Sequence, residues 1–261
     1  ALSERSTIDE VWKAFADPTK KVVFFTAPSI RATLGEAFDM PIGTNVEGKM
    51  VAAIRRLGDC EVFNMDVTAD LTIMEEASEL INRIKTGKPM PMFTSCCPAW
   101  IKFVEQKYPE MIPHLSSCKS PQQMFGALLK TYWCEKHHIS PENLFTVSVI
   151  PCTAKKYECH RPEMEGEVNA AITTRELARM IKTAGIKFTE LPDEEFDNPF
   201  ATATGGGAIF GATGGVMEAA LRTAAHMLDG NFEVLDFFAV RGSNPIKEAT
   251  YLVAGHTLRV A

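Results

Sequence analysis

The sequence lacks several features that would assign it to a specialised class of protein. Its formal net charge is −6, so no basic excess is present to bind a nucleic-acid backbone. No apolar run approaches the ~20 residues that cross a bilayer. Internal repeats and low-complexity segments are absent as well. The composition, with 46% hydrophobic and 23% charged residues, is that of an ordinary globular protein. We therefore expect neither a nucleic-acid partner nor a membrane span.

The seven cysteines lack the spacing of a secreted disulfide scaffold, and their number is odd. We interpret them as reduced thiols or metal ligands and expect a cytoplasmic location, with the periplasm as the alternative. No basic-then-apolar leader opens the sequence, and whether a portion precedes it stays open. Cys134, His137 and His138 hint at zinc, but no second ligand pair follows at finger-like spacing.

Strand-like and helix-like segments alternate, which predicts an α/β fold with mostly parallel, twisted sheets flanked by helices. Ligands in such folds gather at the carboxyl ends of the strands. Capping boxes at Thr44, Thr72 and Thr173 predict helices ending near residues 57, 85 and 184. We expect strands at residues 21–26, 61–65, 92–94, 145–150 and 234–240, further helices at 30–38, 120–137 and 213–225, a hairpin at 251–260, and an irregular, functional or mobile stretch at 187–207.

Two cysteine motifs follow predicted strands, and each has a proline beside the cysteine. Cys96 and Cys97 precede Pro98, and Cys152 follows Pro151. Soft thiolates at strand ends, with lysines and a carboxylate within one turn, indicate an iron–sulfur site. Because adjacent cysteines do not comfortably ligate one metal, one would bind at the helix N-terminus and the other would stay a proton-exchanging thiol. The alternative is that both are small buried hydrophobic side chains.

Two charged groups have a structural and a functional interpretation. Lys155 and Lys156 are either a solvated basic pair or place one ammonium against an anionic ligand set. Glu76, Glu79 and Arg83 lie on one face of a predicted helix. That face is either a wet surface, with an ion pair worth ~0.3–0.5 kcal/mol, or a proton relay if it is partly buried.

A glycine-rich run at residues 204–215 resembles a phosphate-binding loop only superficially. It lacks the lysine of G-x-x-x-x-G-K-[ST], and its glycines miss the G-x-G-x-x-G register. The run therefore argues against a nucleotide site. We expect these glycines to let the backbone approach another chemical group closely.

Seven segments in order resemble the catalytic domain of the iron-only, or [FeFe], hydrogenases. The resemblance covers nearly the whole chain from about residue 21, and the doubled-cysteine loop followed by PCxxKKxE is highly specific to that family. The segments are FTAPSIR, TIMEEASELINRI, MFTSCCPAW, SSCKSPQQMFGALLK, IPCTAKKYE, TTRELARMIK and IFGATGGVMEAALR.

The resemblance implies a cofactor, a reaction and an architecture. The cofactor would be a [4Fe-4S] cluster joined to a two-iron subsite with CO, cyanide and azadithiolate ligands (the H-cluster). The reaction would be the reversible heterolytic oxidation and production of H2. Its electrons would pass to a ferredoxin-like or other iron–sulfur carrier domain or subunit, within a larger multi-subunit complex. Residues 1–261 would form one catalytic domain, with lobes at about 20–117 and 118–261 and the active site in the cleft between them.

The resemblance also assigns roles to individual residues. Cys97 and Cys152 would ligate the cluster, and Cys96 would pass protons to and from the bridgehead amine. The proton route would run from Cys96 through Glu79 and Ser116 to Glu76 and Arg83. Lys155 would hold a cyanide of the distal iron. The residues expected to shape the pocket are Pro28, Ser29, Phe93, Pro121, Gln122 and Phe210.

Three departures from the family pattern keep alternatives open, and one is that the upstream ferredoxin-like domain of the family is not present. The third cysteine loop, which supplies the other two cluster ligands, is absent before Ala261, so we expect a fragment of a longer polypeptide. Ile150 stands where a methionine usually precedes Pro-Cys, which leaves open a sensory or tuned variant. The alternatives are an H2- or redox-sensing module with little turnover and a relative used in iron–sulfur assembly. The doublet of Cys96 and Cys97 counts against the second.

Overall fold

The computed structural model describes residues 5–197, 200, 202–229, 237–242, 244–253 and 255–261. By contact the chain divides into two compact units. Unit 1 comprises Ala1–Met65, Cys97–Ala99 and Ser120–Thr202, and unit 2 comprises Asp66–Cys96, Trp100–Lys119 and Ala203–Ala261. The units are interleaved in sequence, which differs from the consecutive lobes expected at about 20–117 and 118–261. The reason is that a parallel sheet pairs strands that lie far apart along the chain.

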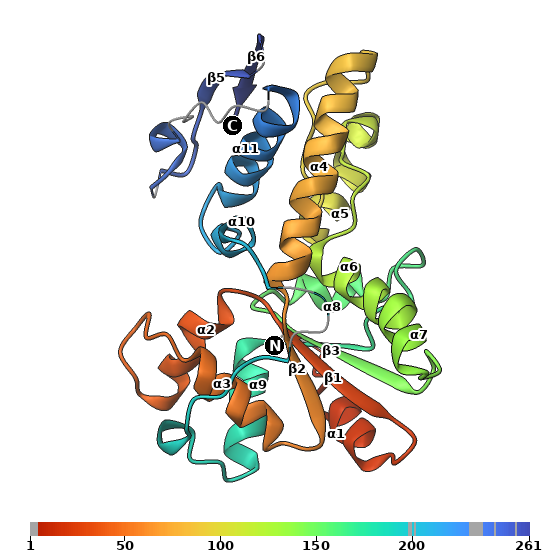
Figure 1. Ribbon diagram of the computed structural model, residues 1–261, viewed down its shortest axis with the longest axis vertical. Helices are drawn as coiled ribbons and strands as arrows, with labels where there is room; N and C mark the ends of the chain where they lie inside the picture. The colour runs from red at the N-terminus through yellow and green to blue at the C-terminus, as the bar shows by residue number, and fades with distance from the viewer. Residues whose placement is uncertain (1–4, 198–199, 201, 230–236, 243, 254) are drawn as a thin grey trace. The chain divides into compact units, whose positions relative to one another are not determined.

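Unit 1 is built on a parallel sheet of four strands in the order β2-β1-β3-β4 (Figure 1). The central strand β1 is buried from Val22 to Thr26, as expected for a strand covered on both faces. The predicted strands near 21–26, 61–65 and 145–150 are confirmed. The fourth strand has only three residues and was not predicted. The strands are β1 (Lys21–Thr26), β2 (Cys60–Asn64), β3 (Leu144–Val149) and β4 (Ala170–Ile172).

Helices and turns accompany this sheet in unit 1, and aromatic side chains fill much of its core. Phe25 and Phe125 stack with ring centroids 4.8 Å apart, and both are fully buried. The helices are α1 (Ile8–Ala16), α2 (Ile30–Thr33), α3 (Glu47–Arg55), α6 (Pro121–Leu128), α7 (Cys134–His137), α8 (Ala154–Glu158) and α9 (Thr174–Thr183). Shorter turns are η1 (Leu34–Phe38), the π-helical η3 (Leu129–Trp133) and η4 (Phe188–Glu190).

Only one of the three predicted capping boxes forms. Thr173 accepts from the Glu176 N–H, and Glu176 bonds back to the Thr173 N–H, so α9 begins as predicted. The prediction at Thr44 is wrong, because its hydroxyl donates to a nearby carbonyl and α3 has no side-chain cap. The prediction at Thr72 is also wrong. This residue lies inside a longer helix and donates to the Thr68 carbonyl 2.8 Å away, a bond that an interior threonine often makes.

Unit 2 is organised around its long helix, α4, which packs against α11. Its core includes Ala77, Leu80 and Ile81 with Leu221 and Ala224. The elements are α4 (Asp66–Thr86), most of α5 (Pro98–Lys107), η2 (Pro109–His114), α10 (Gly205–Ile209), α11 (Gly215–Asp229), η5 (Phe238–Val240), β5 (Ala249–Val253) and β6 (His256–Val260).

Two predictions for the C-terminal part have different outcomes. The predicted hairpin is confirmed, because β5 and β6 pair antiparallel and Gly255 turns with φ +78°. Of the strand predicted at 234–240, residues 234–236 lie outside the described residues. Phe238–Val240 forms a 3₁₀ turn instead. Within the ranges that the structure describes, no helix combines the length and apolarity of a membrane span.

The glycine-rich run begins α10 and lies directly against α4. The Asp70 carboxylate accepts hydrogen bonds from the Thr204 N–H and hydroxyl, both at 2.6 Å, and from the Gly207 N–H at 2.7 Å. A Cβ atom on Gly207 would lie only 2.4 Å from the Asp66 carbonyl oxygen. The expected close approach is therefore present, and the groups approached belong to α4. Asp70 also takes N–H donors that a phosphate loop would offer to its ligand.

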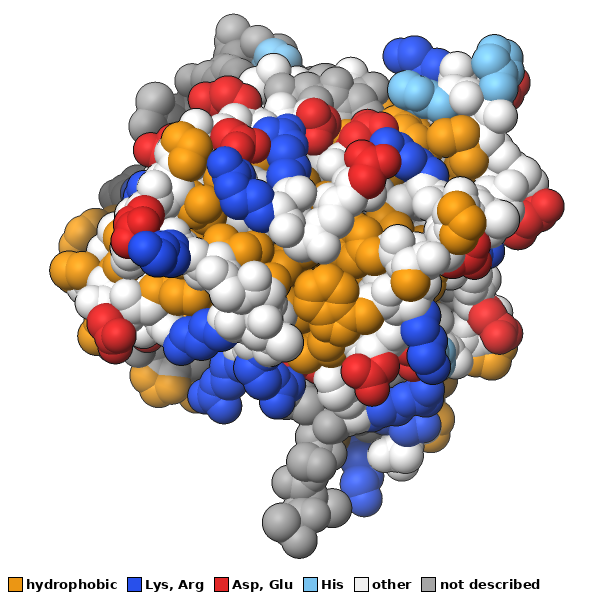
Figure 2. Space-filling model, turned by 90° about the horizontal axis from the view of Figure 1, so that it is seen from below, with side chains coloured by type: hydrophobic (Ala, Val, Ile, Leu, Met, Phe, Trp, Pro, Cys, Tyr) orange, Lys and Arg blue, Asp and Glu red, His pale blue; other side chains and the backbone are white. Residues whose placement is uncertain are grey.

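Charged side chains of both signs share the face drawn in Figure 2. Basic and acidic groups are interspersed there with apolar ones, and neither sign forms a continuous stripe. This pattern agrees with the small net charge of −6.

Candidate functional site

A short parallel contact in unit 2 aligns two chain segments. Phe93 and Leu115 form an isolated bridge, and the Ser116 N–H donates to the Phe93 carbonyl at 2.7 Å. The Ser95 hydroxyl donates to the Cys118 carbonyl at 3.0 Å. The strand end predicted at 92–94 is thus a single bridge. It places the segment before Cys96 beside the segment that carries Ser116.

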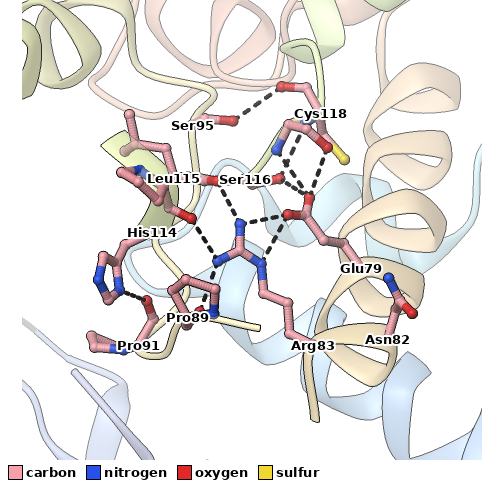
Figure 3. Close-up of polar contacts among 12 residues, drawn as sticks. Glu79, Asn82, Arg83, Pro89, Pro91, Ser95, His114, Leu115, Ser116 and Cys118 are labelled. Carbon is pink, nitrogen blue, oxygen red and sulfur yellow. Dashed lines mark hydrogen bonds and ion pairs between the residues drawn. The ribbon is translucent and has the colours of Figure 1, made fainter. Parts of the chain in front are cut away.

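Arg83 anchors both segments to α4 (Figure 3). Its guanidinium has five N–H donors, and all five are used. Two donate to Glu79, at 2.9 and 2.7 Å. The others donate to the carbonyls of Pro89, Pro113 and Leu115, at 2.9, 3.1 and 2.7 Å. Arg83 is only 5% exposed, so these bonds replace most of its hydration.

Glu79 is held as a carboxylate by donors on both oxygens. Oε1 accepts from Arg83, while Oε2 accepts from the Ser116 hydroxyl and the Ser117 N–H, each at 2.9 Å. Burial raises the pKa of Glu79, but Arg83 and the serine donors outweigh it and leave this pKa below its usual value. The side chain as a whole is 15% exposed, whereas that of Arg83 is 5% exposed.

Glu76, one turn earlier on α4, has the opposite environment. It is 1% exposed, and neither carboxylate oxygen is in hydrogen-bonding geometry with any donor among the described residues. Burial, with a smaller contribution from the charge of Glu79, raises the pKa of Glu76 to about 7. The nearby Ser95 backbone and Ser116 hydroxyl oppose that rise in part. Glu76 can therefore hold or release a proton near neutral pH.

The geometry differs from the order of groups expected from sequence. Glu76, not Glu79, lies near Ser95, the neighbour of Cys96, whereas Glu79 lies beside Arg83. Ser116 is near both carboxyl groups. The wet-surface alternative for this helix face is wrong, because Glu76 and Arg83 are buried. It failed because the segments around residues 89–91 and 113–118 cover a face that looks polar in sequence.

Three residues of this cluster were not predicted: Ser95, Ser117 and Cys118. Burial, opposed by the Ser116 hydroxyl and assisted by nearby carboxylates including Glu76, raises the pKa of the Cys118 thiol to about 11. The Cys118 N–H donates to the Ser116 hydroxyl oxygen at 3.2 Å. The SSCK motif was the available signal, but nothing in its spacing shows which of its residues faces α4.

The boundary between the two units falls between Cys96 and Cys97. Cys96 belongs to unit 2 with Glu76. Cys97, an exposed thiol just before α5, belongs to unit 1 with Cys152, which is partly buried between β3 and α8. This grouping suits different roles for the adjacent cysteines.

A [4Fe-4S] cluster needs four ligands. Within the described ranges, no group of three or more His, Cys, Asp or Glu side chains is placed to hold a metal ion. Cys97 and Cys152 would supply two of those four ligands, and their role as ligands stays a prediction. At the zinc-like motif, Cys134 is buried in the core of unit 1, and the His137 ring stacks on Trp133 at 4.3 Å.

Lys155 is a buried cation in unit 1. It is 8% exposed and donates to both oxygens of Glu158, at 3.0 and 3.1 Å. Ser120 and Gln122 also donate to Glu158, at 2.9 and 3.0 Å. Lys156 instead pairs with Glu176 at 2.7 Å. The solvated-pair interpretation is therefore wrong, and the sequence did not single out Glu158 as the partner that fixes Lys155.

The other predicted pocket residues are divided between the units. Pro28 and Ser29 follow β1 in unit 1 and are partly buried, and Pro121 and the buried Gln122 begin α6. Unit 2 carries the other two, Phe93 and Phe210, both partly buried. The Gln122 side-chain oxygen is buried without a hydrogen-bond partner in the described part of the chain.

Comparison with known proteins identifies the class. Residues 20–261 match the family described as "Iron only hydrogenase large subunit, C-terminal domain". The chain is 49% identical to iron hydrogenase 1 of Clostridium pasteurianum, over 100% of this chain and 46% of that protein. It is 48% identical to the periplasmic [Fe] hydrogenase large subunit of Nitratidesulfovibrio vulgaris, over 98% of this chain and 63% of that protein.

The fold is also similar to that of a solved hydrogenase structure. An apo [FeFe]-hydrogenase HydA1 variant from Chlamydomonas reinhardtii superposes with a TM-score of 0.82 at 42% identity, covering 95% of this chain and 65% of that one. The chain therefore belongs to the family of the iron-only hydrogenase large subunit, C-terminal domain, and its α/β fold is that of [FeFe]-hydrogenases. It spans 46% and 63% of the length of the two curated relatives.

Proposed function

We propose that the full-length protein containing this chain oxidises and produces H2 reversibly. The observation that supports this most strongly is the buried Glu76, next to the donor-saturated Glu79, in a member of the hydrogenase family. When bound, a [4Fe-4S] cluster with a two-iron subsite carrying CO, cyanide and azadithiolate ligands would supply the H2 chemistry and the path for electrons. Those electrons would pass to a ferredoxin-like or other iron–sulfur carrier, within a cytoplasmic, multi-subunit complex.

We assign the roles of cluster ligand and ligand-binding cation to residues of unit 1. Cys97 and Cys152 would hold the cluster, with two further thiolates required beyond them. Cys97 precedes the ten-residue helix α5, whose dipole favours a thiolate at that end. The ammonium of Lys155, fixed by Glu158, would bind an anionic ligand such as cyanide. Pro28, Ser29, Pro121 and Gln122 of the same unit would shape the pocket. The same role for Phe93 and Phe210 of unit 2 stays a prediction.

We assign the proton route to residues of unit 2, in the order Cys96, Glu76, Ser116 and Glu79. Cys96 would exchange protons with the centre as a thiol, and Glu76 would take them up because its pKa is about 7. Ser116 donates its one proton to Glu79, so it can pass a proton on by receiving one from Glu76. Because the pKa of Glu79 is lowered, outward transfer from Glu76 to Glu79 is uphill and inward transfer is downhill.

The test uses the full-length protein, reconstituted with iron and sulfide and then loaded with a synthetic two-iron mimic. Infrared bands of iron-bound CO and cyanide should appear together with H2 turnover. Cys96→Ala should keep its iron but lose nearly all turnover, and Glu76→Gln should lose most of it. Glu75→Gln, an exposed neighbour on α4, should match the unsubstituted protein. Wild-type H2 evolution by Cys96→Ala would refute the relay.

A sensing module with little turnover is the second candidate, favoured by the buried Ile150 two residues before Cys152. It predicts the CO and cyanide bands without rapid turnover. Replacing Ile150 by Met should then raise turnover. An iron–sulfur assembly relative predicts cluster absorbance and no such bands after loading with the mimic.

A further inference from the structure

The Ser95 hydroxyl begins a directional chain of three hydrogen bonds in unit 2 (Figure 3). Ser95 donates to the Cys118 carbonyl at 3.0 Å, and the Cys118 N–H donates to the Ser116 oxygen at 3.2 Å. Ser116 then donates its proton to Glu79 at 2.9 Å. Cys118 is thus held on both sides of its Cα, by Ser95 and by Ser116.

This series of hydrogen bonds determines which groups face Glu76. A hydroxyl has one proton, and that of Ser116 goes to Glu79, so Glu76 receives none. The groups that act on Glu76 are the Ser95 backbone, the Ser116 hydroxyl and the charge of Glu79. The Cys118 thiol is also electrostatically coupled to Glu76. Among these, the Ser95 backbone is the largest contribution that favours the ionised form.

We infer that Ser95 is a positioning residue of the proton relay: its bond to Cys118 keeps its own backbone near Glu76 and fixes Ser116 toward Glu79. Without this bond, the nearest link between the two segments among the described residues would be the backbone pairing at Phe93, two residues earlier. The functional meaning of this inference rests on the proposed function. Its test does not, because the ionisation of Glu76 can be followed without any cluster.

The experiment measures the Glu76 titration in the full-length protein purified without iron. The carboxylic C=O stretch is followed by infrared difference spectroscopy against pH, and Glu76→Gln identifies the band. Ser95→Ala should raise the midpoint above its value of about 7. The rise should be less than about one pH unit, because the Ser95 backbone is not in hydrogen-bonding geometry with Glu76 and so contributes less than the ~1.5 kcal/mol of a full hydrogen bond to a charged group.

Two further variants distinguish a specific effect of the Ser95 hydroxyl from a general loss of local stability. Ser95→Thr keeps the hydroxyl and should keep the midpoint of the unsubstituted protein. Ser78→Ala removes another hydroxyl–carbonyl bond, from Ser78 to Met74 at 2.7 Å on the exposed side of α4, and should also leave the midpoint unchanged. The inference is overturned if Ser95→Ala titrates like the unsubstituted protein. It is also overturned if Ser95→Thr shifts as far as Ser95→Ala, or, should Ser95→Ala not fold, if Ser95→Cys leaves the midpoint unchanged.

In the protein loaded with the two-iron mimic, Ser95→Ala should shift the alkaline limb of the pH profile of H2 evolution to higher pH by a similar amount. A shifted Glu76 midpoint with no H2 turnover in any variant would support the positioning role and count against the proposed function. Full H2 turnover together with an unshifted Glu76 midpoint in Ser95→Ala would support the proposed function and count against the positioning role of Ser95.

Discussion

Replacing Glu76 by Gln should make the protein more stable at alkaline pH and not at acidic pH. Glu76 is buried without a hydrogen-bond partner in the described part of the chain, so its ionised form is disfavoured in the folded state. Glutamine has nearly the same shape and no charge. The substitution therefore removes the cost of ionisation with little change in packing.

The size of this effect follows from the pKa of Glu76, which rises from 4.5 to about 7 on folding. A difference of about 2.5 pH units corresponds to about 3 kcal/mol. Between these two values the folded state binds more protons than the unfolded state, so stability falls as pH rises. The cost is absent below the unfolded pKa and complete above the folded one. Glu76→Gln should thus gain about 3 kcal/mol at about pH 8 and little at about pH 4.

The assay is urea unfolding of both proteins across this pH range, with the m-value checked for constancy. If the two units unfold separately, the effect belongs to the transition that contains α4. Glu75→Gln is the matched control, because Glu75 is the exposed residue next to Glu76 on the same helix. A stability difference between Glu76→Gln and the unsubstituted protein that stays flat across the pH range would refute the reasoning.

Four further substitutions test the packing around these sites by chemical unfolding. Gly207→Ala should cost about 2 kcal/mol or more, because its Cβ would meet an α4 carbonyl at 2.4 Å, whereas Gly205→Ala meets nothing within 4 Å and should be neutral or slightly stabilising. Arg83→Lys should cost about 2–4 kcal/mol, since one ammonium cannot replace five donors. Lys156→Met should cost about 3–5 kcal/mol by removing the nearer cation of the buried Glu176, whose other cation, Arg179, is exposed and 4.0 Å away. Equal stability of the two glycine variants, or an unchanged stability of the Arg83→Lys or Lys156→Met protein, would contradict these accounts.

The strands of unit 1 were predictable because their signal is local. Residues 21–26 are a continuous apolar run, which is typical of a strand buried on both faces. The three-residue strand β4 has too few residues for any periodic pattern. The failed capping boxes at Thr44 and Thr72 show the limit of a four-residue motif. The same spacing arises inside helices and in turns, where another acceptor takes the hydroxyl.

The candidate site was predictable in composition but not in order. The residue types and the resemblance singled out Glu76, Glu79 and Arg83. Which carboxylate is buried alone, and which is saturated with donors, depends on segments about 30 residues away that cover one turn of α4. Likewise, the adjacent lysines 155 and 156 look alike in sequence. Only the tertiary fold assigns them to Glu158 and Glu176.

The saturation of Arg83 also bears on where a proton route can end. A guanidinium does not lose a proton in proteins, and all five of its N–H groups are committed, so Arg83 has no means of handing a proton to water. What it does is hold Glu79 ionised and fix two loops to α4. The outer end of the proposed route would then be Glu79 itself, whose side chain is partly exposed. On this argument Arg83 acts on proton transfer only through the pKa and position of Glu79.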